Sequence, residues 1–130
     1  MMLLLKVKGL SQGHSGVALS TVQRLLDHWN ASVLPVVPEQ GSLGASGDLA
    51  PLAHMVLPLI GLGEVTMPDG RQLPSDEALS ELGWAPLELG PKEGLALING
   101  TQMMLGMGMV ALERIGRLAS WADAVGAWSL

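Results

Sequence analysis

Residues 41–54 read GSLGASGDLAPLAH, and this glycine-rich stretch runs directly into the start of a helix. Its closely spaced glycines break any regular period, which predicts a loop. Asp48 is a good helix N-cap, and Pro51 falls in the first turn, where a helix tolerates proline. The stretch therefore predicts a tight loop followed by a helix over residues 49–60, which Pro58 kinks or ends.

The rest of the chain is predicted to be mainly helical, from the spacing of apolar residues and from capping residues. Further helices are expected over residues 16–30 with Ser15 as the N-cap, from Ser75 to a stop at Gly83, over residues 92–98, and from residue 101 to the end of the chain. Residues 64–73 hold a Pro-Asp-Gly turn between two short extended arms, which predicts a β-hairpin. Residues 32–47 are expected to be loop. The predicted fold class is mainly α, a segment of a long-helix bundle with one small β-hairpin.

Two of these helices have an apolar face at helical spacing. In the first, it comprises Ala18, Val22, Leu25, Leu26 and Trp29. In the last, it comprises Met107, Ala111, Ile115, Leu118, Ala122 and Val125. Glu113 and Arg117 are expected to pair across one turn of the last helix.

Composition excludes several classes of protein. The 130 residues are 48% hydrophobic and 15% charged, which excludes a disordered chain. A net charge of -5 offers no basic surface to a nucleic acid, and the absence of cysteine excludes disulfides and thiolate metal sites. The length fits one domain at most. The aromatic content is 3%, all of it Trp, which hints at a segment of a larger helical body.

Residues 94–112 carry no charge and approach the length of about 20 residues that spans a bilayer. Asn99, Thr101 and Gln102 lie inside this run, together with several glycines. We therefore expect buried helices of a soluble protein rather than a membrane span. The apolar start MMLLL is too short for the core of a signal peptide, because Lys6 interrupts it.

Four interpretations of residues 41–54 are open. A nucleophile elbow around Ser46 would need glycine at position 48, where Asp48 stands. A phosphate cradle would need the Lys and Ser/Thr of a P-loop. A third interpretation is a purely structural loop with an Asp cap. The fourth is cyclisation of Ala45-Ser46-Gly47, in which an unhindered glycine nitrogen attacks the alanine carbonyl and the serine loses its hydroxyl as water.

The fourth interpretation agrees with a family resemblance. The stretch VVPEQGSLGASGDLAPLAHM, residues 36–55, resembles the signature of the aromatic amino acid ammonia-lyases, most closely their histidine branch. Residues 8–40 resemble the helix that leads into this loop, and GPKEGLALINGTQMMLGMGMVALERI, residues 90–115, resembles a second segment of the family. The resemblance covers the whole chain, and its two motifs agree in order and spacing.

The resemblance implies the site residues. Ala45, Ser46 and Gly47 would form a methylidene-imidazolone ring autocatalytically, with Ser46 becoming its dehydroalanine part and no external cofactor or metal. Asn99 would be the active-site asparagine near the ring and the substrate. Its plainer alternative is a residue at a helix break whose amide satisfies backbone groups between Ile98 and Thr101.

The resemblance also implies a function: non-oxidative deamination of L-histidine to trans-urocanate and ammonia by a cytoplasmic homotetramer that binds neither nucleic acid nor membrane. A phenylalanine or tyrosine ammonia-lyase or aminomutase, and a non-catalytic helical module, are the alternatives. The family's catalytic Tyr has no counterpart here, because the chain contains no Tyr. Residues 1–130 are thus expected to be a single, incomplete segment of an ammonia-lyase domain that lacks the base for removing a β-proton.

The remaining polar residues suggest less. The histidines His14, His28 and His54 show no metal-ligand spacing, and His54 is expected to be a hydrogen-bonded core residue. Lys92 and Glu93 are expected to have structural roles at the start of their helix. The methionines at positions 103, 104, 107 and 109 are expected to serve packing.

Overall fold

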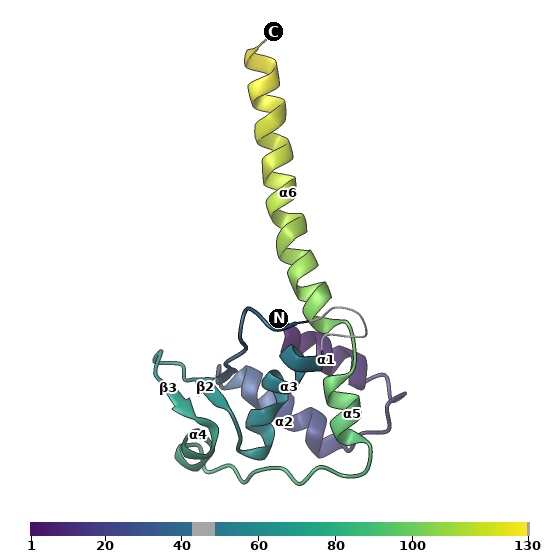
Figure 1. The fold of residues 1–130 in the computed structure, drawn as a ribbon, viewed down its shortest axis with the longest axis vertical. Coiled ribbons are helices and arrows are strands. Elements are labelled where there is room, and N and C mark those ends of the chain that lie inside the picture. Colours follow the sequence, from purple (N-terminus) through teal and green to yellow (C-terminus); the bar gives the residue numbers. More distant parts are fainter. Residues whose placement is uncertain (43–48, 130) are drawn as a thin grey trace.

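Six α-helices, one 3-10 helix and three short strands make up the part of the chain that the computed structural model describes, residues 1–42 and 49–129. In chain order they are α1 (Met2–Leu10), α2 (Leu19–Asn30), β1 (Leu34–Pro35), α3 (Leu49–Val56), the 3-10 helix η1 (Leu57–Ile60), β2 (Glu64–Thr66), β3 (Gln72–Pro74), α4 (Ser75–Glu81), α5 (Glu93–Ile98) and α6 (Gln102–Trp128). Figure 1 shows the short elements gathered in one body, from which α6 projects. The predicted mainly helical fold is confirmed.

The helix predicted after the glycine-rich loop is present as α3 followed by η1. Pro58 lies in the first turn of η1, so the expected kink takes the form of a change from α to 3-10 geometry. Gly61 ends η1 in the left-handed conformation at φ +78°, which glycine adopts without steric cost. Asp48, the expected N-cap of α3, lies outside the described residues.

The predicted hairpin belongs to a larger sheet. β2 and β3 pair antiparallel around the Pro-Asp-Gly turn, with Val65 opposite Leu73. β1 adds a third strand on the other side of β2, with Pro35 opposite Val65. The expectation that residues 32–47 are all loop is therefore wrong at β1. Proline is tolerated there because β1 is an edge strand.

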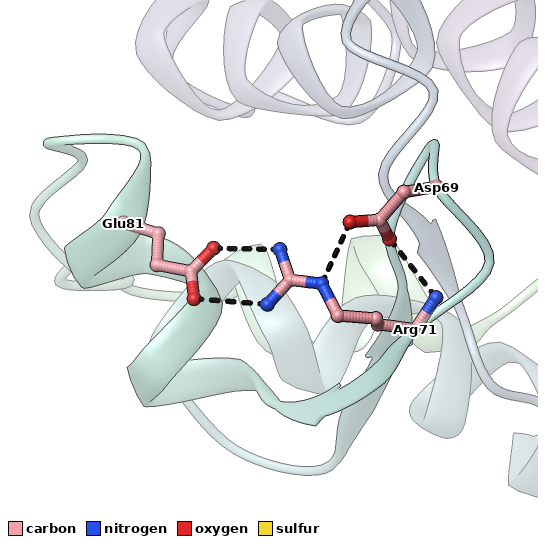
Figure 2. A network of polar contacts seen from close by, with 3 residues as sticks. All are labelled: Asp69, Arg71 and Glu81. Atoms are coloured by element: carbon pink, nitrogen blue, oxygen red, sulfur yellow. Dashed lines mark hydrogen bonds and ion pairs between the residues drawn. The ribbon is translucent and has the colours of Figure 1, made fainter.

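An arginine cluster ties the hairpin turn to the following helix. The Nε atom of Arg71 lies 2.6 Å from Oδ2 of Asp69, and the guanidinium donates to both carboxylate oxygens of Glu81 in α4, at 3.3 and 3.2 Å (Figure 2). The hydrogen bonds from Arg71 lower the pKa of the Asp69 carboxyl. All three side chains are about half exposed, so water screens this network.

Helix α2 differs from its prediction in its start and in its buried face. It begins at Leu19 rather than near residue 16, and its N-cap residue is Ala18, which has no capping side chain of its own, so the assignment of Ser15 as N-cap is wrong. Its buried residues are Thr21, Leu25 and His28, whereas Trp29 is 37% exposed. The buried face is rotated from the predicted one because α2 packs a polar threonine and histidine inward.

The main core lies between α1, α2, α3, η1 and α5. Its buried members are Leu3, Leu10, Leu25, Leu52, Met55, Val56, Leu59 and Leu97. A smaller cluster lies under the sheet and α4, formed by Val33, Val65, Met67 and Ala78. The core thus draws side chains from segments as far apart as Leu3 and Leu97, and it holds α3 and α5 against each other.

Helix α6 is the least covered element. Gly106 is its one buried residue among those described, and Leu118 and Trp121 are each 68% exposed. The expectation that residues 94–112 are buried is therefore wrong within this chain for residues 104–112, of which only Gly106 is buried. By length and composition, one described segment could cross a membrane, Glu93–Trp128, although the chain breaks it between α5 and α6. The predicted pairing of Glu113 with Arg117 is confirmed.

Candidate active site

The predicted ring residues, Ala45, Ser46 and Gly47, lie outside the described residues. The elements on either side of the candidate site are described. Helix α3 begins at Leu49, two residues after Gly47, and it packs against α5 and α6. Helix α5 ends at Ile98, one residue before Asn99. The fold therefore packs α3, which follows the predicted ring residues, against α5, which ends directly before Asn99.

Asn99 ends α5 in an extended conformation, with φ -95° and ψ 134°. Its backbone N–H donates to the carbonyl of Leu95 at 3.0 Å. Its side chain is exposed, and no hydrogen bond joins its amide to any described residue. The amide therefore does not fill the alternative role of satisfying backbone groups at the helix break, and it is free to contact a ligand.

A small cleft of about 360 Å³ lies beside Asn99, lined by Ser15, Lys92, Leu95 and Ala96 as well. Among the described residues that line it, the polar side chains are one amide, one hydroxyl and one ammonium, with no carboxylate. Such donors suit a partner that carries or develops negative charge. The donor set thus fits an anionic group such as an amino acid carboxylate better than a metal ion, and no group of metal-binding side chains occurs among the described residues.

Lys6 of α1 holds the backbone at this point. Its Nζ donates to the carbonyl of Asn99 at 2.7 Å and to that of Ala96 at 3.2 Å. The residue is 1% exposed, and this burial lowers the pKa of its ammonium to about 8. The last carbonyls of a helix lack partners within it, so Lys6 satisfies groups that would otherwise be orphaned. Sequence reasoning missed this residue, although its helical spacing from Leu3 and Leu10, which places it on the same face of α1, was a signal for it.

Glu93 fixes the other end of α5. Its Oε1 accepts from the Ala18 N–H at 2.7 Å and from the Thr21 hydroxyl at 2.8 Å, and its Oε2 accepts from the Gly90 N–H at 2.6 Å. These hydrogen bonds, led by that from Ala18, lower the pKa of the Glu93 carboxyl. Glu93 thus supplies the cap that α2 lacks from its own side chains, which agrees with the predicted structural role.

The link from α5 to α6 depends on a glycine. Gly100 has φ +141°, and a β-carbon there would meet the side chain of Gln102, with the Cδ atom at 3.0 Å. The Oε1 atom of Gln102 is buried and has no hydrogen-bond partner in the described structure. The Asn-Gly-Thr-Gln sequence therefore forms a tight turn that only glycine allows at its second position.

The histidines and methionines differ from their predictions. His54 is exposed, so the expectation of a core histidine there is wrong. The buried histidine is His28, which contacts Trp84 edge-on and lies 3.2 Å from the carbonyl of Val33. Burial lowers the pKa of His28. Met104, Met107 and the methionine at position 109 are exposed rather than packed within this chain.

Comparison with known proteins decides the family. The family model described as aromatic amino acid lyase matches residues 1–130. The chain belongs to the aromatic amino acid lyase family. Histidine ammonia-lyase from Chloroflexus aurantiacus is 55% identical over 128 residues, which are 98% of this chain and 24% of that protein.

Solved structures agree with this assignment. The fold is similar to that of histidine ammonia-lyase from Trypanosoma cruzi, with a TM-score of 0.79 and 45% identity over 87% of this chain and 22% of that one. Tyrosine aminomutase from Streptomyces globisporus gives a TM-score of 0.78 and 44% identity, over 87% of this chain and 21% of that one. The chain spans about a quarter of the length of the curated relatives that it matches.

Proposed function

We propose that these residues form one segment of a longer enzyme, called the parent enzyme below, which deaminates L-histidine to trans-urocanate and ammonia. The observation that carries this proposal is the identity of about half or more with histidine ammonia-lyases along nearly the whole segment. In the reaction the Cα–N and one Cβ–H bond break and a Cα=Cβ double bond forms. The parent enzyme is proposed to be a cytoplasmic homotetramer.

The proposed reactive group is a methylidene-imidazolone made from Ala45, Ser46 and Gly47. When formed, this ring supplies the electrophile that activates the substrate for loss of its amine. The start of α3 at Leu49 supports the proposal, because the positive end of a helix beside the loop favours negative charge there.

Asn99 is proposed to orient the substrate or the ring through its unpartnered amide. Two features support this role: the amide makes no hydrogen bond to the described residues, and it lines a cleft whose other polar side chains, among the described residues, are the donors Ser15 and Lys92. The backbone that carries it is held on both sides, by Leu95 and by Lys6. An amide with a fixed backbone and free donor and acceptor atoms can bind without first breaking an internal hydrogen bond.

Substrate turnover tests the proposal. We expect purified parent enzyme to produce the ultraviolet absorbance rise of urocanate from L-histidine and to convert L-phenylalanine and L-tyrosine slowly. Faster conversion of L-tyrosine would contradict the histidine assignment and favour the tyrosine ammonia-lyase or aminomutase alternative. Failure to convert any of the three amino acids would favour a non-catalytic helical module.

A further inference from the structure

The backbone at the end of α5 is held by one buried side chain from a distant part of the sequence. Lys6 and Asn99 are 93 positions apart, and α1 brings the lysine to the last carbonyls of α5. The Leu95 carbonyl receives the Asn99 N–H, so the peptide groups on both sides of the Asn99 α-carbon are fixed. These two peptide groups set the direction of the Cα–Cβ bond, from which the amide extends.

Lys6 makes these contacts in an unusual setting for a lysine. It is almost fully buried, and no described carboxylate pairs with it. The buried carboxylate of Glu93 is committed to donors at the other end of α5. Burying an ammonium without a counter-ion is costly, and the two helix carbonyls offset part of that cost. An apolar residue would pack in this core at lower cost, so the lysine is expected to serve more than stability.

From this geometry we propose that Lys6 is a positioning residue for Asn99, which fixes the backbone of Asn99 so that its free amide faces the cleft beside Ser15 and Lys92. This inference rests on the proposed function of Asn99 and adds a residue to it. Lys6 contacts the carbonyls of Ala96 and Asn99. It acts on the reaction through Asn99, whose amide needs a constant position for effective contact with the reacting groups.

A double-mutant cycle in the parent enzyme tests this role. Lys6→Met keeps the aliphatic stem and removes the donors, and Asn99→Ala removes the amide. We expect Lys6→Met to lower kcat by between about 10- and 100-fold with a smaller change in KM. We expect the double variant to be no slower than Asn99→Ala, because Lys6 acts through the amide that is already absent. Rates are expressed per ring-containing site, measured from the mass of the peptide over residues 41–54.

Lys8→Met is the matched control, because Lys8 lies on the same helix with an exposed side chain. Its kcat should stay within about twofold of wild type. Amide hydrogen exchange over residues 96–102 should be faster in Lys6→Met and unchanged in Lys8→Met. If Lys6→Met does not fold, Lys6→Gln takes its place in the cycle with the same expectations.

Additive effects of the two substitutions, within about twofold, would overturn the proposal and leave Lys6 a purely structural residue. An unchanged kcat in the folded Lys6 variant would overturn it as well. The activity of the wild-type parent enzyme separates the two proposals. If the proposed function is wrong, the wild-type enzyme converts no amino acid. If only the Lys6 proposal is wrong, the wild-type enzyme is active.

Discussion

At the scale of single residues, two buried charges hold the two ends of α5. Glu93 is the first residue of this helix, and Lys6 contacts its last carbonyls. A carboxylate at the N-terminus and an ammonium at the C-terminus both have the sign that the helix dipole favours. A helix of six residues is too short to be stable alone, so these contacts and the core around Leu97 maintain it.

Glu93→Gln should destabilise the parent enzyme. The amide keeps one acceptor oxygen and turns an NH₂ group toward backbone donors that the carboxylate now satisfies. We expect a loss of about 2–3 kcal/mol in the free energy of unfolding. Thermal or denaturant unfolding measures it, with Glu88→Gln as the control, since Glu88 is exposed. Equal midpoints for the two variants would show that the Glu93 hydrogen bonds add nothing to stability.

The same carboxylate predicts a dependence on pH. The folded state lowers the pKa of Glu93 below the ordinary value of 4.5, so the folded state binds this proton less readily than the unfolded state. The stabilisation is therefore complete above pH 4.5 and is lost as the pH falls through the lower, folded-state pKa. The midpoint of wild type should consequently fall more steeply below pH 4.5 than that of Glu93→Gln. Parallel curves for the two proteins would contradict this origin of the acid sensitivity.

At the scale of elements, the parts predicted correctly are those whose signals are local. Pro58, the Pro-Asp-Gly turn and Gly83 each act within a few residues. They predicted the break in the helix at Pro58, the hairpin of β2 and β3, and the end of α4. The start of α2 was wrong because Glu93, far along the chain, binds the Ala18 N–H. Strand β1 was missed because its partner β2 lies some thirty positions later.

The residues of the candidate site likewise divide into those that a local motif predicts and those that depend on distant contacts. A motif was enough to single out Asn99, and residues 45–47 stay a prediction because they lie outside the described residues. Lys6 carries no motif, and its role depends on how α1 packs against α5, which no local pattern encodes.

Gly100→Ala should disturb the turn between α5 and α6. The left-handed φ of +141° strains an alanine, and its β-carbon would press on Gln102. We expect a loss of about 1–3 kcal/mol in stability together with lower kcat, because the turn follows Asn99 directly. Gly9→Ala is the matched control, since its β-carbon would meet the same Gln102 side chain at an ordinary 3.6 Å. Wild-type stability and kcat in Gly100→Ala would contradict the requirement for glycine.

At the scale of the whole molecule, the uncovered helix α6 is the dominant feature (Figure 1). Many of its apolar side chains are exposed in this chain, and those of Leu112, Leu118 and Trp121 are about two-thirds or more exposed. Together with Met1, Pro35 and Val37, the beginning of α6 lines an apolar groove of about 790 Å³. Exposure on this scale agrees with the proposal that the chain is one segment of a longer enzyme, whose other parts would cover α6.

Limited proteolysis tests this arrangement. A long helix without tertiary contacts is only marginally stable and opens often enough for a protease. We expect a protease specific for arginine to cut the isolated 130-residue chain at Arg114 and Arg117 quickly. The parent enzyme should resist cleavage at both sites by at least about tenfold. Equal cleavage rates in the two proteins would mean that α6 stays uncovered in the parent enzyme.

We expect that Ser46 of an active parent enzyme does not persist as serine. Mass spectrometry of the peptide over residues 41–54 measures this. The wild-type peptide should show a deficit of two water molecules, and Ser46→Ala should show the unmodified mass pattern and lose nearly all activity. A fully active enzyme whose peptide retains intact Ala45-Ser46-Gly47 would rule out ring formation, and a structural loop with a capped helix would then be the better description of this stretch.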